Sequence, residues 1–70
     1  MRKFEIVYCF KDWRGYVETY EDGLEKYYID EVEAYNGADA IERLKNKEEF
    51  VNEPEIVSIK IKEELYERNI

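Results

Sequence analysis

The sequence contains no histidine, and this absence excludes several kinds of catalytic and metal-binding chemistry. Catalytic triads built on histidine, acid–base catalysis by imidazole and the usual zinc sites all depend on that residue. The chain also has no glycine-rich phosphate loop and no serine–lysine pair suited to nucleophilic catalysis. We therefore expect a protein that is not an enzyme and that holds no cofactor and no metal ion.

Cysteine is almost absent as well, because Cys9 is the only one and an internal disulfide cannot form. A single thiol suits a reducing compartment. No apolar run is long enough for a signal peptide or a membrane span, so we expect a cytoplasmic protein that does not bind membranes. Cys9 lies in an apolar strand pattern, which favours packing over the cationic surroundings that a reactive thiolate needs.

Positive charge is in short supply: 18 acidic residues against 11 basic ones give a net charge of -7. The excess is uneven, since residues 21–36 sum to -5 and residues 48–70 sum to -4. Each contact with a nucleic-acid phosphate needs a cation, so this balance argues against direct binding of nucleic acid. A protein partner with a basic surface fits better.

What the chain does contain is enough apolar material for one small folded domain over residues 1–70. Hydrophobic residues make up 44% of the chain and aromatic residues 16%, which is too much for a disordered tail. A chain of this length buries only about 60% of its unfolded surface, so its core is small.

The change from a strand pattern to a helix pattern is clearest at Asn36. Before it, Val32 and Ala34 alternate with polar residues, whereas after it apolar residues recur at helical spacing and predict a helix over 37–47. The side-chain oxygen of Asn36 can accept a backbone amide of the first turn as an N-cap, and Asp39 suits the positive end of the helix.

Alternation of apolar and polar residues predicts further strands at 3–10, 25–35 and 55–63. The segment 11–25 leaves two layouts open, a meander or a longer excursion, and its Asp-Gly pair favours a short extra hairpin strand at 16–20. Beyond the last strand, the apolar residues of the segment 65–70 can add to packing or to a partner surface.

These elements predict an α+β fold, an antiparallel-rich sheet of three to four strands with one helix packed on one face, in the order strand, strand, optional strand, helix, strand. The helix is expected to cover Phe4, Ile6, Val32, Ala34, Val57, Ile59 and Ile61. The other face is expected to present Val7, Cys9, Tyr27, Ile29 and Ile56. Such an apolar face indicates a homodimer or another partner, unless the segment 11–25 folds back and covers it with Trp13, Val17 or Tyr20.

Acidic and aromatic side chains are the main candidates for partner binding, because tyrosine and tryptophan anchor interfaces and carboxylates attract basic surfaces. The candidates are Glu18, Tyr20, Glu21, Asp22, Glu25, Asp30, Glu31 and Glu33. No group of carboxylates has the spacing of a metal-binding loop. The sequence therefore favours a non-enzymatic acidic protein-binding module.

In its size, charge, single cysteine and tyrosine content the chain resembles small phage and mobile-element proteins that block host nucleic-acid-handling machinery, including anti-CRISPR proteins. The resemblance implies an inhibitor whose carboxylates stand in for phosphates on a basic surface of its target. Two alternatives stay open. One is a homodimeric structural or adaptor subunit of a larger complex, and the other is a small enzyme that uses carboxylates or the Cys9 thiolate.

Overall fold

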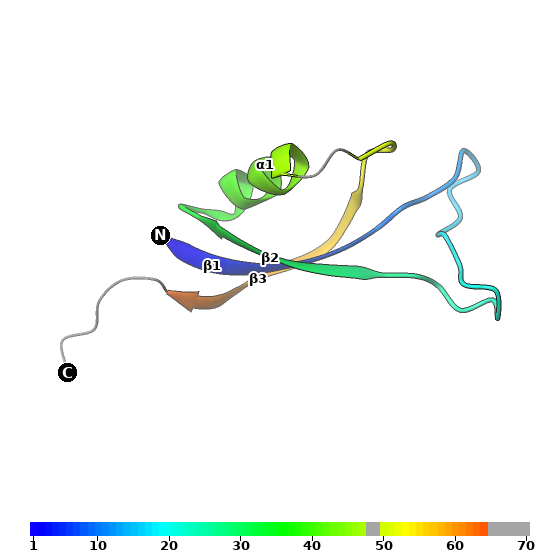
Figure 1. Ribbon diagram of the computed structural model, residues 1–70, viewed down its shortest axis with the longest axis horizontal. Helices are drawn as coiled ribbons and strands as arrows, with labels where there is room; N and C mark the ends of the chain where they lie inside the picture. The colour runs from blue at the N-terminus through cyan, green and yellow to red at the C-terminus, as the bar shows by residue number, and fades with distance from the viewer. Residues whose placement is uncertain (48–49, 65–70) are drawn as a thin grey trace.

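The computed structural model describes residues 1–47 and 50–64 of the chain. The elements follow in the order β1 (Arg2–Cys9), β2 (Tyr28–Ala34), α1 (Gly37–Lys47) and β3 (Glu55–Glu64). The strands form one antiparallel sheet in the order β2-β1-β3, and α1 packs against one face of it (Figure 1). This confirms the predicted α+β class, with three strands in the described residues. The prediction for the segment 65–70 lies outside them.

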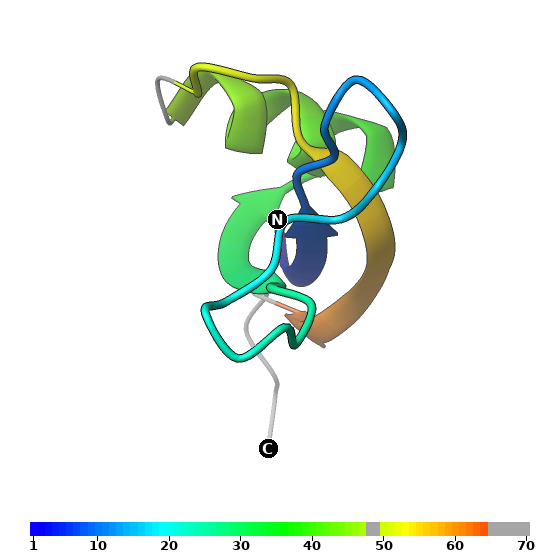
Figure 2. The same ribbon diagram turned by 90° about the vertical axis from the view of Figure 1, so that its right-hand side faces the viewer.

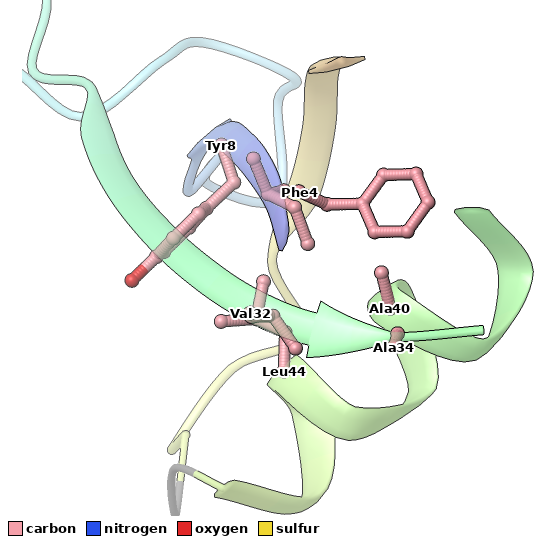
Figure 3. Close-up of a cluster of buried hydrophobic side chains, with 7 residues drawn as sticks. Phe4, Tyr8, Val32, Ala34, Ala40 and Leu44 are labelled. Atoms are coloured by element: carbon pink, nitrogen blue, oxygen red, sulfur yellow. The ribbon is translucent and has the colours of Figure 1, made fainter. Parts of the chain in front are cut away.

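The core lies between α1 and the sheet because every second residue of β1 points toward the helix. Phe4 and Ile6 of β1 are buried, and Phe4 lies opposite Val32 of β2. Figure 3 shows Leu44 and Ala40 of α1 approaching Val32 and Ala34 from the helix side. The buried cluster consists of Phe4, Ile6, Tyr8, Val32, Ala34, Ala40 and Leu44.

Helix α1 begins and ends where the sequence predicts, and its first turn is capped by side chains. Asn36 Oδ1 accepts the backbone amide of Asp39 at 2.8 Å. The Asp39 carboxylate accepts the backbone amide of Tyr35 at 3.0 Å and the Nε–H of Arg43 at 2.9 Å. The Tyr35 amide is the main reason that the pKa of Asp39 lies below its ordinary value, and Arg43 adds to the shift. The predicted N-cap is therefore confirmed.

Replacing Asn36 with alanine is expected to lower the free energy of unfolding by about 1 kcal/mol, because the Asp39 amide loses its acceptor at the start of the helix. Asn36→Asp keeps a cap oxygen and serves as the matched control, with a change of a few tenths of a kcal/mol. Urea unfolding followed by circular dichroism measures both. Equal stability of Asn36→Ala and the unchanged chain would show that the cap contributes nothing.

Strand β3 departs from the predicted alternation, because its pairing with β1 shifts at two places. Tyr8 lies opposite Ile56 while Val7 lies opposite Ser58, so Val57 is an extra residue in the strand. One extra residue moves the side chains beyond it to the other face. Ile56 consequently packs against the core on the helix side, and Val57 is 53% exposed. The predicted positions of Ile56 on the uncovered face and Val57 under the helix are both wrong.

Helix α1 covers the three strands of the sheet unevenly. The helix follows β2 directly in the chain and packs on β2 and β1 (Figure 1). Ile61 of β3 lies opposite Phe4 on the helix side but remains exposed, whereas Ile59 is partly buried against the core. Of the predicted inward row on β3, only Ile59 is packed as expected.

The segment between β1 and β2, residues 11–27, forms an arm that projects beyond the sheet at one end of the molecule (Figure 1). The structure measures 49 × 23 × 16 Å, and the arm accounts for much of the long dimension. The predicted strand at 16–20 does not form. Only two isolated bridge pairs occur here, Lys11 with Val17 and Thr19 with Glu25. The chain instead makes two successive turns.

Candidate functional site

The arm consists of two hairpins of the same shape, offset by eight residues along the chain. In the first, the Asp12 amide donates to the Tyr16 carbonyl at 2.9 Å, and in the second the Tyr20 amide donates to the Leu24 carbonyl at 2.8 Å. They meet at Glu18, whose amide donates to Phe10 and whose carbonyl accepts the amide of Lys26, both at 2.8 Å. This shared residue explains why the arm holds a defined shape without a strand of its own.

Each hairpin turns at a glycine that has left-handed backbone geometry. Gly15 has φ 89° and Gly23 has φ 86°, and their amides donate back to the carbonyls of Asp12 and Tyr20. A side chain is disfavoured in this conformation, so glycine is the natural residue. The two glycines eight residues apart are the sequence signal that could have revealed the paired hairpins.

Replacing Gly23 with alanine is expected to destabilise the second hairpin by about 1 kcal/mol, through backbone strain alone, because no atom lies within 4 Å of the new Cβ position. Gly37→Ala is the matched control. Gly37 has no such backbone strain, its nearest neighbour would be Ile59 Cδ1 at 3.7 Å, and alanine favours the helix. Hydrogen exchange at the Tyr20 amide measures the local effect. Unchanged protection there in Gly23→Ala would contradict it.

The first hairpin presents a tryptophan on a braced turn. Trp13 is 92% exposed. Arg14 lies 5.7 Å from the Trp13 ring centre and 5.0 Å from that of Tyr16, and its Nη2 donates to the Asp12 carboxylate at 2.8 Å. The other Asp12 oxygen accepts the backbone amides of Arg14 and Tyr16. The bond from Arg14 is the main cause that lowers the pKa of Asp12.

The second hairpin carries most of the predicted acidic binding residues. Residues 18–25 contain four carboxylates and no lysine or arginine. Glu21 and Asp22 lie exposed at the turn, where Asp22 Oδ1 accepts the Leu24 amide at 3.0 Å. Tyr20 and Leu24 are also exposed. The structure thus brings together five of the predicted residues, namely Glu18, Tyr20, Glu21, Asp22 and Glu25.

Two of these carboxylates also order the base of the arm. The Tyr28 hydroxyl donates to Glu18 at 2.9 Å and the Tyr27 hydroxyl donates to Glu25 at 2.9 Å. The second bond is the main reason that the pKa of Tyr27 is raised. Lys26 lies over the rings of Tyr20 and Tyr28, at 5.3 and 5.4 Å. These hydrogen bonds and ring contacts connect the base of the arm to Tyr27 and Tyr28.

The remaining predicted acidic residues lie on β2, where alternation separates them. Asp30 faces the helix side, accepts the Tyr8 hydroxyl at 2.8 Å and lies 4.0 Å from Lys47 of α1. Glu31 and Glu33 lie on the opposite face and are exposed. Asp30 therefore contributes to the structure around Tyr8, and only Glu31 and Glu33 extend the acidic surface of the arm along the sheet.

The face of the sheet turned away from α1, here called the open face, is part charged and part apolar. Glu5 and Glu31 lie directly opposite each other, and their repulsion is offset by Lys60, 3.4 Å from Glu5, and by Lys62, which pairs with Glu31. The bond from Lys62 is the main cause that lowers the pKa of Glu31. These side chains lie over the half of the open face where β1 begins.

The apolar half of the open face is narrower than the sequence predicts. Ile29 lies opposite Val7 and is 65% exposed, and Tyr27 is exposed beside it. Cys9 is only 2% exposed, so it adds no surface for a partner. Trp13 does not fold back over this face, because it is almost wholly exposed, and Tyr27 and Ile29 remain uncovered. Val7, Tyr27 and Ile29 remain as the apolar part of the predicted interface.

A hollow of about 630 Å³ lies beside the first hairpin. The carboxylates of Asp12, Glu18 and Glu25 line it, and each already accepts a hydrogen bond from a neighbouring side chain. Within residues 1–47 and 50–64 no group of three or more potential ligands is placed to hold a metal ion. In the same residues no helix has the length and apolarity needed to cross a membrane.

Comparison with protein-family models, curated proteins and solved structures finds no match to this chain.

Proposed function

We propose that this chain is a cytoplasmic, non-enzymatic protein-binding module that presents an acidic and aromatic surface to a basic surface of its partner. The observation that carries the proposal is the arm. It extends away from the core and exposes Trp13, Tyr16, Tyr20 and Leu24 together with the carboxylates of the second hairpin. Large exposed aromatic side chains on an ordered support are typical of residues that dominate binding energy at interfaces.

The charge of the arm supports a basic partner. Among the described residues no ion pair is formed by Glu21, Asp22 or Glu25, so their negative charge is directed to solvent. Glu33 continues this charge along β2, beside Glu31, whose charge is paired with Lys62. Carboxylates so arranged can occupy the place of phosphates on a protein that handles nucleic acid, and the chain would then act as an inhibitor or an adaptor.

Capture from nuclease-treated lysate tests the proposal when the wild-type chain is compared with Glu21→Lys/Asp22→Lys. Glu42→Lys/Glu55→Lys has the same change in charge on other elements and is the control. We expect a protein that the wild type and the control retain, that the arm variant loses, and that about 0.5 M salt releases, because salt screens exposed charges. Absence of any salt-sensitive protein, or equal capture by all three chains, would contradict the proposal.

A second candidate function is that of a homodimeric structural or adaptor subunit. The exposed Ile29 and its neighbour Val7 favour it, since burying them would add to a small core. Sedimentation equilibrium would then give a mass of twice 8.6 kDa, and Ile29→Lys would return it to the monomer value. A concentration-independent monomer mass for the wild type would exclude this candidate and leave the first untouched.

A further inference from the structure

The two outer strands of the sheet differ in how well their free edges are protected. In β3 the pairing shifts at Val57 and at Lys62, and such bulges, together with edge lysines, discourage a further strand from adding. In β2 the pairing with β1 runs unbroken through seven residue pairs, from Arg2 opposite Ala34 to Tyr8 opposite Tyr28. Figure 2 shows β2 and β3 on either side of β1, with α1 above them. The regular edge is that of β2.

The charges of β2 restrict what can add to that edge. Asp30, Glu31 and Glu33 lie within its seven residues, and the strand itself contains no lysine or arginine. Lys62 of β3 pairs with Glu31 and Asp30 accepts the Tyr8 hydroxyl, so of these three Glu33 is the one whose charge has no partner among the described residues. A second copy of β2 paired antiparallel about Glu31 would place the two Glu31 side chains directly opposite each other, which is destabilising. A strand with lysine or arginine at the facing positions would gain favourable pairs instead. The edge of β2 is therefore regular, but like charges disfavour the addition of a second copy of β2.

We propose that the outer edge of β2 binds an extended, lysine- or arginine-rich segment of a partner protein by strand addition. Backbone hydrogen bonds to β2 would supply affinity, and the acidic side chains would select the basic sequence. The inference rests on the proposed function, since it names a second contact to the same basic partner. The arm follows directly into β2, so both contacts lie along one continuous stretch of chain.

The geometry of β2 specifies the probe, an acetylated and amidated peptide Thr-Lys-Val-Lys-Lys-Val-Thr. Aligned antiparallel to β2, its lysines lie opposite Glu33, Glu31 and Asp30. Two further peptides carry N-methyl groups on alternate residues, in complementary patterns. Because a strand directs alternate amides to opposite sides, only one pattern blocks the edge that faces β2. A fourth peptide has glutamate in place of every lysine.

Titration into the isotopically labelled full chain, followed by backbone amide NMR shifts, gives the result. We expect one N-methylated peptide to bind at least tenfold more weakly than the parent, the other to bind like the parent, and the glutamate peptide not to bind. The shifts should follow β2 and not β3, and Glu31→Lys/Glu33→Lys should abolish them while Glu42→Lys does not. Equal binding of both N-methylated peptides would show charge attraction without strand addition and would overturn the inference. So would shifts on β3, or no binding of the parent peptide at roughly millimolar concentration.

The arm variant Glu21→Lys/Asp22→Lys separates this inference from the proposed function. It leaves β2 unchanged, so it should bind the peptide while losing the captured partner. If the peptide fails but capture through the arm succeeds, the function stands and strand addition at β2 is wrong. If the peptide binds as expected but no partner depends on the arm, strand addition at β2 stands and the proposed function of the arm is wrong.

Discussion

Replacing Leu44 with alanine is expected to lower the free energy of unfolding by about 2–5 kcal/mol. Leu44 is wholly buried and is the largest side chain that α1 places in the core (Figure 3). Its removal leaves a cavity against Val32 and takes away a main apolar contact between helix and sheet. A domain of this size has a total stability of about 3–10 kcal/mol, so the variant should be largely unfolded at moderate urea concentration.

Two matched variants decide whether the loss comes from the core. Leu44→Met keeps most of the volume and should cost less than about 1.5 kcal/mol. Val51→Ala removes an apolar side chain that is 98% exposed, and should change stability by no more than about 0.5 kcal/mol. Urea unfolding followed by tyrosine and tryptophan fluorescence measures all three. A Leu44→Ala chain as stable as Val51→Ala would show that α1 does not pack as described.

Replacing Trp13 with alanine is expected to weaken partner binding by at least about 2 kcal/mol, roughly 30-fold in the dissociation constant. Trp13 touches solvent over most of its surface, and its turn is held by Asp12 and Gly15 without it. The free chain therefore loses almost nothing in stability, while the complex loses a large apolar anchor. Trp13→Phe keeps part of the aromatic surface and should fall between.

Isothermal titration with the captured partner measures the binding loss, and urea unfolding of the free variants measures stability. The expected pattern is a large change in affinity with a change in stability within about 0.5 kcal/mol. A variant that binds like the wild type would remove the first hairpin from the interface. Val51→Ala, exposed on another part of the chain, is the control for loss of an exposed apolar side chain.

The elements that the sequence predicts well are those whose signals are local. The bounds of α1 follow from the helical spacing of Ala40 and Leu44 together with the Asn36 cap, and β1 follows from its aromatic and β-branched residues. Each of these signals is set by neighbours a few residues away, so one sequence suffices to find it.

The features that were missed depend on partners distant in the chain. The bulge at Val57 is a shift in the pairing of β3 with β1, and it places Ile56 against the core and not on the open face. Lys62 of β3 pairs with Glu31 of β2 across the middle strand β1. The sequence around either residue alone does not predict this ion pair on the open face. Among the acidic and aromatic candidates, those of the second hairpin lie together, whereas the alternation of β2 places Asp30 on the other face from Glu31 and Glu33.

Whether the acidic surface of the arm drives association is decided by the dissociation constant of the captured partner, measured against salt concentration for the wild type and for Glu21→Lys/Asp22→Lys. We expect the wild-type constant to rise more than tenfold between about 0.05 and 0.5 M salt, because exposed charges drive the association. The arm variant should bind weakly at every concentration and depend far less on salt. A wild-type constant that stays the same over this range, or that the charge reversal leaves unchanged, would contradict binding through the acidic surface of the arm.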